Sequence, residues 1–342
     1  MATKHTVLFL TGRGLRHQQA ALASTPPELD VTMLRQPPRQ EVLRRLPQVE
    51  FLISERAGEI DAEMIAAGRK LRLIQRLGSL AYDIDLDAAR AAGVPVCIWP
   101  IRSVIMVAEH MMMQTLALAR RLNEATQITL EAGNWGQAAR RTDEDTFAYN
   151  WSNRQHIGGI YQQKVGILGF GEIGAELARR LRGFAPAAIL YYKRRRLPES
   201  VEAELGLTYT LEDHLFAESD FLCNLLPYFP ETDMSLNADV FACMKRGACL
   251  VSCGSGSVID EAALAEALRA GQLGGAALDT YEWEPIRPDN PLLPLARDPA
   301  MNVLLTPHIA AGAGPATGSG REEDFENIRR VLRGEPLLFR LA

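Results

Sequence analysis

One stretch constrains the fold of this chain more than any other: Lys164–Gly174, which reads KVGILGFGEIG. A short apolar run leads into glycines with the spacing Gly-x-Gly-x-x-Gly. In this pattern the first glycine permits a tight turn from strand to helix, the second lets a pyrophosphate approach the main chain, and the third lets helix and strand pack closely. The free N–H groups of the first helical turn bind the phosphates. The stretch therefore predicts a dinucleotide site, made by Gly169, Gly171, Glu172, Ile173 and Gly174.

The residues that follow support this interpretation. The run 175–181 has the composition of a helix, and the apolar run 188–192 after it is typical of a strand. Strand, glycine turn, helix and strand form the βαβ unit in which this motif binds nucleotides. The alternative, a glycine-rich turn that binds no nucleotide, stays open at this point.

Composition and charge exclude some classes of protein. At 342 residues the chain is too long for one comfortable core, so we expect two domains. Hydrophobic residues make up 47% and charged residues 23% of the chain, which is typical of a soluble globular protein. The formal net charge of −5 argues against a nucleic-acid partner, because such proteins normally carry a basic face.

Signals for export or membrane insertion are weak. The apolar run before Thr11 is too short for a signal peptide. The long apolar region 104–122 predicts a buried helix rather than a membrane span, because polar side chains interrupt it. These are Glu109, His110, Gln114, Arg120 and Arg121. The five cysteines form no Cys-x-x-Cys pair, so free thiols are a simpler interpretation than a metal site. We therefore expect a cytoplasmic protein with no membrane partner and no metal.

Residues 5–103 alternate apolar strands with polar helices, which indicates a parallel sheet covered on both faces. The expected strands are 5–10, 31–34, 51–54, 73–76 and 96–98, and the expected helices lie around 41–47, 61–68 and 86–92. Ligands of such folds bind at the loops that follow the strands. This places Arg13, Glu55, Arg56 and the turn 77–81 at a possible cleft.

The stretch 132–163 has weak periodicity and many aromatic side chains. A loop this long inside a compact domain is either functional or an interface segment. Two interpretations stay open: the segment makes a dimer contact or packs on the surface, or one of its aromatic side chains covers a substrate.

The alternation of strands and helices continues towards the C-terminus. Apolar runs at 219–227, 248–252, 276–279 and 302–307 are typical of strands. Between them a helix is expected to begin at Asp260 and Glu261 and to end at Gly271. The tail 322–331 is expected to be helical and is close to the size needed to pack back onto the first domain.

Six motifs in order resemble those of the D-2-hydroxyacid dehydrogenase family, which includes phosphoglycerate, formate, glyoxylate and phosphonate dehydrogenases. They are VAEH at 107–110, LGFGEIG at 168–174, LPYFPET at 226–232, IDEAAL at 259–264, GAALDTYEWEP at 275–285 and LTPHI at 305–309. The resemblance covers nearly the whole chain. It implies an α/β fold of two doubly wound parallel-sheet domains. A Rossmann-type dinucleotide domain, 104–308, would be inserted into a smaller flavodoxin-like substrate domain, 1–103 plus 309–342.

The same resemblance implies roles for individual residues. His308 matches the catalytic acid/base, and Glu284 matches the carboxylate that orients it and stabilises its protonated form. A histidine titrates near neutrality, so it can give a proton to a carbonyl oxygen as a hydride arrives. Asp279 matches the residue that contacts the nicotinamide amide. Other positions match the rest of the dinucleotide site, Leu226, Pro227, Cys253 and Gly254, or the substrate side, Leu77, Gly78, Ser79, Leu80, Arg102 and Trp283.

The first departure from the family concerns the substrate carboxylate. The family usually has Asn-Thr-Ala-Arg-Gly where this chain has Ser-Cys-Gly-Ser-Gly at 252–256, so Ser255 stands in the arginine's place within the catalytic set. A serine hydroxyl does not replace a charged bidentate fork. Three explanations stay open. Arg102, Arg56 or Arg287 supplies the fork, or the substrate has no carboxylate beside its carbonyl, or the protein binds a dinucleotide without turnover.

The second departure lies in the substrate-domain turn. The family tends to have Gly-x-Gly-x-Asp there, and this chain has Gly-Ser-Leu-Ala-Tyr at 78–82. Leu80 and Tyr82 replace a glycine and an acid, which removes anion-binding character or adds apolar bulk. Together with Ser255, this favours a substrate unlike a simple small 2-oxoacid.

The third departure concerns the cofactor. An acidic residue normally ends the second strand of the nucleotide domain and binds the ribose hydroxyls of NAD. Here the strand at 188–192 is followed by Lys193, Arg194, Arg195 and Arg196. Several cations and no acid favour a 2′-phosphate, so we expect NADP(H) to be preferred and NAD(H) to be possible. A solvated basic turn is the alternative.

These observations predict a homodimeric NAD(P)-dependent dehydrogenase or reductase acting on CH–OH donors. It would transfer hydride between a nicotinamide cofactor and a small carbonyl or hydroxy substrate. The alternative from another class is a dinucleotide-binding sensor or scaffold without catalysis.

Overall fold

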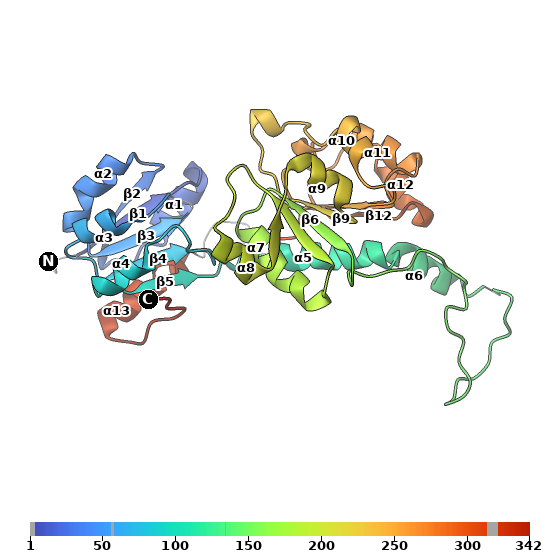
Figure 1. The fold of residues 1–342 in the computed structure, drawn as a ribbon, viewed down its shortest axis with the longest axis horizontal. Helices are drawn as coiled ribbons and strands as arrows, with labels where there is room; N and C mark the ends of the chain where they lie inside the picture. The colour runs from blue at the N-terminus through green and yellow to red at the C-terminus, as the bar shows by residue number, and fades with distance from the viewer. Residues whose placement is uncertain (1–3, 56–57, 134, 313–320) are drawn as a thin grey trace. The chain divides into compact units, whose positions relative to one another are not determined.

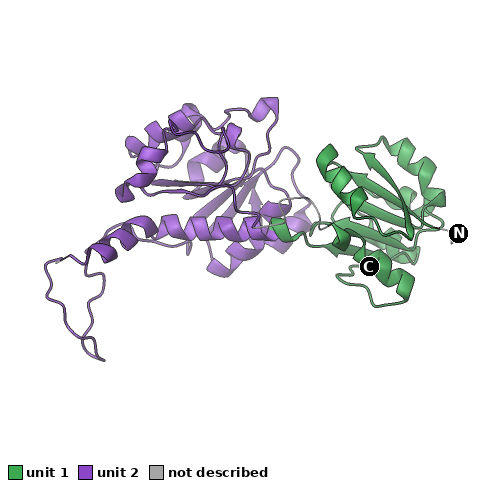
Figure 2. Cartoon of the chain, turned by 180° about the vertical axis from the view of Figure 1, so that it is seen from behind, with its two compact units in different colours: residues 1–104, 313–342 green, residues 105–312 purple. Residues whose placement is uncertain are grey.

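The computed structural model describes residues 4–55, 58–133, 135–312 and 321–342. The chain forms two compact units, Met1–Val104 with Ala313–Ala342, and Ile105–Gly312 (Figure 2). Each unit is built on one parallel sheet with helices packed against it (Figure 1). The α/β fold of two parallel-sheet domains expected from the sequence is therefore confirmed.

The first unit contains a five-stranded sheet in the order β2-β1-β3-β4-β5, in which every pair is parallel. Its strands are β1 (His5–Thr11), β2 (Leu29–Arg35), β3 (Phe51–Glu55), β4 (Leu73–Leu77) and β5 (Val96–Trp99). Its first four helices are α1 (Leu15–Ala23), α2 (Arg39–Arg45), α3 (Ala62–Ala67) and α4 (Leu86–Ala91). The predicted strands and three of these helices are confirmed, while α1 was not predicted.

Both faces of this sheet are buried, because neighbouring residues of each strand enter different cores. Leu8 and Leu10 of β1 pack with the residues of α2, α3 and α4. Val7 and Phe9 pack on the other face, with Phe325 and Ile328 from the C-terminal tail. The tail helix α13 (Glu326–Arg333) therefore belongs to the first unit, as the sequence predicted.

The second unit contains a seven-stranded sheet in the order β12-β11-β10-β9-β6-β7-β8, again with parallel pairs. The strands are β6 (Lys164–Leu168), β7 (Ala188–Tyr192), β8 (Leu207–Tyr209), β9 (Phe221–Asn224), β10 (Cys249–Ser252), β11 (Gly275–Leu278) and β12 (Val303–Leu305). The helices that follow strands are α7 (Glu172–Leu181), α8 (Glu199–Leu205), α9 (Glu212–Glu218), α10 (Ala238–Cys243), α11 (Glu261–Arg269) and α12 (Leu293–Arg297).

The order of the strands reverses between β6 and β9. From β6 the chain proceeds to β7 and β8 on one side, and it returns through β9 to β12 on the other. In open α/β sheets, ligands bind outside the carboxyl ends of the strands at such a reversal. The glycine turn after β6 and the turn after β9 both lie there.

The helix expected at 104–122 is present over most of that range, but it ends three residues early. Helix α5 (Arg102–Ala119) ends before Arg121, which has a φ of +48°, and a second helix, α6 (Leu122–Glu131), follows. A positive φ is uncommon for a residue other than glycine and cannot continue a right-handed helix. The expectation of full burial is also too simple, because Met113 of α5 is exposed. None of the helices in the described part of the chain is long and apolar enough to cross a membrane.

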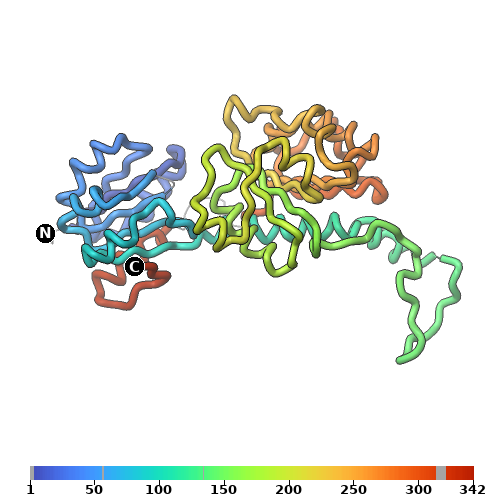
Figure 3. The backbone as a smooth tube through the Cα atoms, in the orientation of Figure 1, coloured from blue at the N-terminus to red at the C-terminus, as the bar shows by residue number. Residues whose placement is uncertain are grey.

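The described residues from 135 to 158 contain no helix or strand. The backbone tube runs out from the end of α6 and back to β6 in this segment (Figure 3). We call residues 135–158 the arm. It is tied to α6 by an ion pair between Arg154 and Glu124, and its side chains Phe147 and Tyr149 are exposed.

Candidate active site

The glycine turn has the geometry that its spacing predicts. Gly169 has a φ of +83°, and a Cβ atom there would lie 2.8 Å from the main-chain nitrogen of Leu226. Gly171 is the residue before α7, and a Cβ there would meet nothing within 4 Å. A Cβ on Gly174 would lie 3.0 Å from the ring of Phe170. The turn is therefore tight, open at the N-terminus of α7 and closely packed behind it, which fits the pyrophosphate of a dinucleotide.

The end of β7 lies beside this turn. The carbonyl oxygen of Tyr192 accepts a hydrogen bond from Gly169 N at 3.1 Å. Beyond it, Arg194 and Arg195 are exposed, and the guanidinium of Arg194 lies 5.5 Å from the ring centre of Phe229. The half-buried Lys193 stands between β7 and these arginines.

Arg196, the last cation of the basic run 193–196, is paired within the chain. Arg196 forms a two-pronged ion pair with Glu202, with contacts of 2.9 Å and 2.7 Å. The buried hydroxyl of Tyr191 donates to the same carboxylate at 2.6 Å. Arg196 thus stabilises the loop, and Arg194 and Arg195 are the exposed arginines that remain beside the glycine turn.

The turns after β9 and β10 are joined by main-chain contacts. Ser255 N donates to the carbonyl oxygen of Leu226 at 2.8 Å, and a Cβ on Gly254 would lie 2.7 Å from that oxygen. The thiol of Cys253 donates to the side chain of Gln114 at 3.5 Å, and burial raises the pKa of this thiol. These contacts bring Leu226, Cys253 and Gly254 together, as the predicted dinucleotide site requires.

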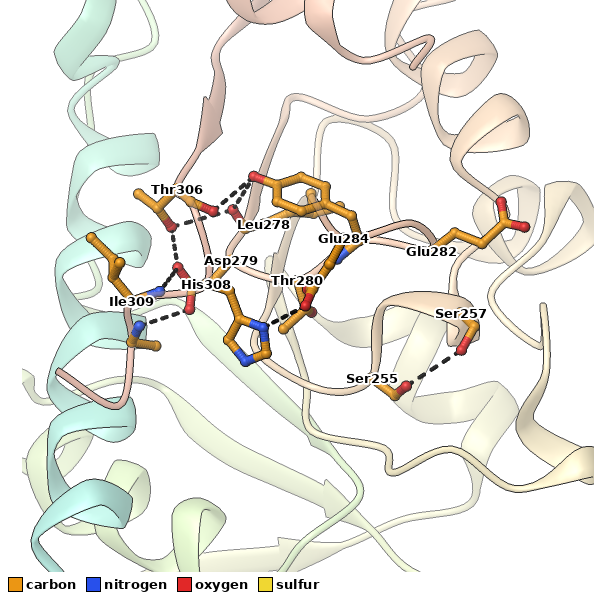
Figure 4. Close-up of polar contacts among 12 residues, drawn as sticks. Ser255, Ser257, Leu278, Asp279, Thr280, Glu282, Glu284, Thr306, His308 and Ile309 are labelled. Carbon is orange, nitrogen blue, oxygen red and sulfur yellow. Dashed lines mark hydrogen bonds and ion pairs between the residues drawn. The ribbon is translucent and has the colours of Figure 1, made fainter. Parts of the chain in front are cut away.

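His308 and Glu284 are in direct contact. His308 Nδ1 lies 2.7 Å from Glu284 Oε2 (Figure 4). The other carboxylate oxygen of Glu284 accepts a hydrogen bond from Tyr281 N at 3.1 Å. The His308 side chain is 58% exposed. The pair is therefore oriented from behind by the main chain and open to solvent on its imidazole side.

Asp279 lies behind this pair and is buried. Both of its carboxylate oxygens accept hydrogen bonds from the loop that carries His308. Asp279 therefore stabilises the loop that carries His308. Its contact with the nicotinamide amide stays a prediction.

A pocket of about 330 Å³ lies beside His308. Its lining includes His308 and the carboxylates of Glu284 and Glu282, and none of the described residues that line it is a lysine or arginine. The hydroxyl oxygens of Ser255 and Ser257 face each other here at 3.4 Å, while the Glu282 side chain points away from His308 (Figure 4). Ser255, which stands where the family has an arginine, thus lines a pocket to which the second unit contributes no lysine or arginine.

The three arginines that could supply the missing fork are placed differently. Arg287 forms a two-pronged pair with Asp289 at 3.0 Å and 2.8 Å and lies over the exposed ring of Trp283. Arg102 is exposed at the start of α5. Arg56 lies outside the described residues. Because its guanidinium is paired with Asp289, Arg287 is not a free substitute for the family's arginine.

The predicted substrate-side turn belongs to the first unit. The side chain of Leu77 is part of the apolar core there, and Gly78 is buried with a φ of +129°. Ser79 and Leu80 are half-buried. Only the main chain of Leu77 can therefore face a ligand, because its side chain packs inward.

Sequence reasoning missed two supporting residues, Tyr281 and Thr306. The hydroxyl of Tyr281 donates to the carbonyl oxygen of Thr306 at 2.9 Å, and its N–H holds Glu284. Both residues lie inside the family-like motifs at 275–285 and 305–309, so the sequence did mark their positions. A position within a motif does not, however, indicate which way the side chain points.

The chain is similar to known proteins of one family. Residues 112–310 match the family described as D-isomer specific 2-hydroxyacid dehydrogenase, NAD binding domain. The glyoxylate reductase of Korarchaeum cryptofilum is 35% identical over 311 residues, which are 90% of this chain and 87% of that protein. The D-3-phosphoglycerate dehydrogenase of Mycobacterium leprae is 31% identical over 93% of this chain, and the chain spans 56% of its length.

Solved structures show the same fold. A glyoxylate reductase from Paecilomyes thermophila superimposes with a TM-score of 0.53 at 26% identity, covering 100% of this chain and 99% of that one. A protein from Pyrococcus horikoshii gives a TM-score of 0.56 at 27% identity, covering 99% and 96%. With the family match over more than half of the sequence, these findings show that the chain belongs to the D-isomer specific 2-hydroxyacid dehydrogenase family, with the NAD-binding domain at residues 112–310.

Proposed function

We propose that the protein is a nicotinamide-dependent oxidoreductase that interconverts a carbonyl and an alcohol, with His308 as its acid/base. The observation that carries the proposal is the 2.7 Å contact between His308 and Glu284 at the edge of a pocket lined by Ser255. Relatives that are 35% and 31% identical to this chain bear the names glyoxylate reductase and D-3-phosphoglycerate dehydrogenase.

The proton chemistry follows from the partners of His308. The Glu284 carboxylate only accepts hydrogen bonds, so the hydrogen of the neutral ring sits on Nδ1. Nε2, which has no partner among the described residues, then accepts a proton from an alcohol. In the opposite direction the protonated ring gives this proton to a carbonyl oxygen, and the negative charge of Glu284 stabilises the imidazolium. A bound nicotinamide would supply or accept the hydride.

The substrate is proposed to be bulkier or less charged than a small 2-oxoacid. Ser255 provides a hydroxyl where the family has a guanidinium, and the charges that line the pocket include two carboxylates, Glu282 and Glu284. A carboxylate beside the substrate's carbonyl would gain no ion pair with lysine or arginine on this wall and would be repelled by these groups.

NADP(H) is the proposed cofactor, with NAD(H) as a possible second. Arg194 and Arg195 are exposed beside the glycine turn, while Arg196 is held by Glu202. Guanidinium groups bind phosphate with charge-assisted hydrogen bonds, so these two support a preference for the 2′-phosphate.

A homodimer is also proposed, with the arm as the contact. Phe147 and Tyr149 are 73% and 88% exposed, and such large apolar side chains are typical of interfaces. Replacement of both by serine is expected to give a monomer in sedimentation, and an unchanged dimer would contradict the role of the arm.

The test of the proposed function is cofactor binding by fluorescence, combined with a screen of oxoacids, aldehydes and ketones. Turnover of any of them supports the oxidoreductase. Binding without turnover supports the second candidate, a dinucleotide sensor or scaffold, which the missing arginine at Ser255 favours.

A further inference from the structure

Two residues that the proposed chemistry leaves unused meet behind the loop that carries His308. His110 Nε2 lies 3.0 Å from Thr306 Oγ1, and the His110 side chain is only 11% exposed. Thr306 Oγ1 lies in turn 2.5 Å from Asp279 Oδ1. The three side chains come from α5, from the residue after β12 and from the residue after β11, so this network joins three elements of the second unit.

The chemistry of the carboxylate decides where the hydrogens lie. Asp279 only accepts, so the Thr306 hydroxyl donates to it. The oxygen of that hydroxyl is then free to accept from His110, which carries its hydrogen on Nε2. Burial lowers the pKa of His110, against a smaller opposing effect of the Asp279 charge, and this favours the neutral ring that donates.

The Asp279 carboxylate accepts from the Thr306 hydroxyl before His308 and from two main-chain N–H groups after it. Its Oδ1 accepts from Ile309 N at 3.0 Å, and its Oδ2 accepts from Ala310 N at 2.7 Å (Figure 4). His308 itself has a φ of +53°, a conformation that non-glycine residues rarely adopt. Hydrogen bonds on either side of His308 therefore hold it in a backbone conformation that the residue would not choose alone.

Thr306 is also linked to Glu284. Its carbonyl oxygen accepts from the Tyr281 hydroxyl at 2.9 Å, and Tyr281 N donates to Glu284 Oε1 at 3.1 Å. The carbonyl oxygen of Thr306 also accepts a hydrogen bond from His308 N at 3.0 Å. Thr306 thus lies at the junction of the supports of the imidazole and of its carboxylate partner.

We propose that His110 and Thr306 are positioning residues for the acid/base. Hydrogen bonds that run from His110 through Thr306 to Asp279 fix the main chain of residues 306–310 and so keep the His308 ring on Glu284. The proposal rests on the proposed function, because it assigns the acid/base role to His308.

Paired variants test it. Thr306→Val removes the hydroxyl and is expected to lower kcat by about 10- to 100-fold, because small misplacements of a reacting group cost this much. KM values for cofactor and substrate are expected to change less than about threefold, since neither His110 nor Thr306 is among the residues proposed to bind cofactor or substrate. Thr306→Ser restores the hydroxyl and kcat. His110→Leu lowers kcat in the same direction, and His110→Gln, which keeps an N–H donor, recovers it.

The matched control is Thr115→Val. Thr115 is buried on the same helix as His110, and its hydroxyl donates to the carbonyl oxygen of Met111 at 2.7 Å. Its loss is expected to lower the melting temperature and to leave kcat unchanged. If Thr306→Val does not fold, the pair His110→Leu and His110→Gln decides the question.

A second readout needs no substrate. Long-range proton–nitrogen spectra show which ring nitrogen of His308 carries the hydrogen. The Nδ1–H form is expected in the wild type and in Thr115→Val, and a mixture of forms is expected in Thr306→Val and His110→Leu. Unchanged kcat and an unchanged ring form in both of these variants would overturn the proposal. Full activity of His308→Gln would instead overturn the proposed function. In that case the ring form of His308, compared between the wild type and the Thr306 and His110 variants, would still show whether this network positions the ring.

Discussion

His308 and Glu284 are joined through one nitrogen and one oxygen, 2.7 Å apart, so the two residues act as one unit. Glu284→Gln keeps the shape of the side chain and removes its charge. We expect kcat to fall by about 100-fold, because the imidazolium that forms during alcohol oxidation loses its stabilising carboxylate. Steady-state kinetics at saturating cofactor measure this. The exposed Glu231→Gln is the control, and a Glu284→Gln enzyme with wild-type kcat would remove Glu284 from the mechanism.

Cofactor preference is expected to depend on Arg194 and Arg195. The double change to alanine removes charge-assisted hydrogen bonds worth about 1.5–3 kcal/mol each, so KM for NADP(H) should rise at least about 10-fold. KM for NAD(H), which has no 2′-phosphate, should change less than about threefold. Arg246→Ala, another exposed arginine of the same unit, is the control. Wild-type enzyme with a clear preference for NAD(H) would contradict the assignment.

The substitution Ser255→Arg is expected to restore activity towards small 2-oxoacids. A guanidinium at this position would add a charged hydrogen bond worth about 1.5–3 kcal/mol, which corresponds to about 10- to 100-fold in kcat/KM for glyoxylate. Ser200→Arg adds the same charge on the exposed surface of α8, outside this pocket, and should give little gain. Wild-type turnover of glyoxylate or hydroxypyruvate with kcat/KM above about 10⁴ M⁻¹ s⁻¹ would refute the proposed substrate class.

Stability is expected to fall below neutral pH in a way that depends on His110. Its pKa is lowered in the folded protein by burial, from a model-peptide value of 6.5. The unfolded chain therefore binds the proton first, so this contribution to stability is complete above pH 6.5 and is lost as the pH falls towards the lowered value. Each such group contributes at most about 1.4 kcal/mol per pH unit.

Melting temperatures between pH 7.5 and 5 test this. The wild type should lose stability more steeply than His110→Gln, which does not titrate. Burial also lowers the pKa of His17. Its contribution to the pH dependence of stability is the same in both proteins and therefore cancels in the comparison. Parallel curves for the two proteins would contradict the prediction.

Local patterns were enough to predict most strands and the glycine turn. The spacing of Gly169, Gly171 and Gly174 carries its own geometry, because each position has a steric reason to lack a side chain. Helix α1 was missed, since its sequence LRHQQAALA buries only Ala21 and follows an N-cap glycine without a capping side chain. The break at Arg121 was missed because no glycine or proline marks it.

The contact between two candidate site residues was predictable from the sequence, and several other contacts were not. The match of His308 with Glu284 came from motif order, and the structure brings them together. The capture of Arg196 by Glu202 and the inward packing of Leu77 depend on how separate segments fold together. The pairing of Arg287 with Asp289, only two residues away, could have been suspected from the sequence.

The role of His308 as the acid/base is decided by the turnover and the dinucleotide affinity of His308→Gln, both compared with those of the wild type. We expect a kcat at least about 1,000-fold lower, since the variant loses the group that gives and accepts the proton, with cofactor affinity within about threefold. A His308→Gln enzyme that keeps more than about a tenth of wild-type kcat would contradict this role.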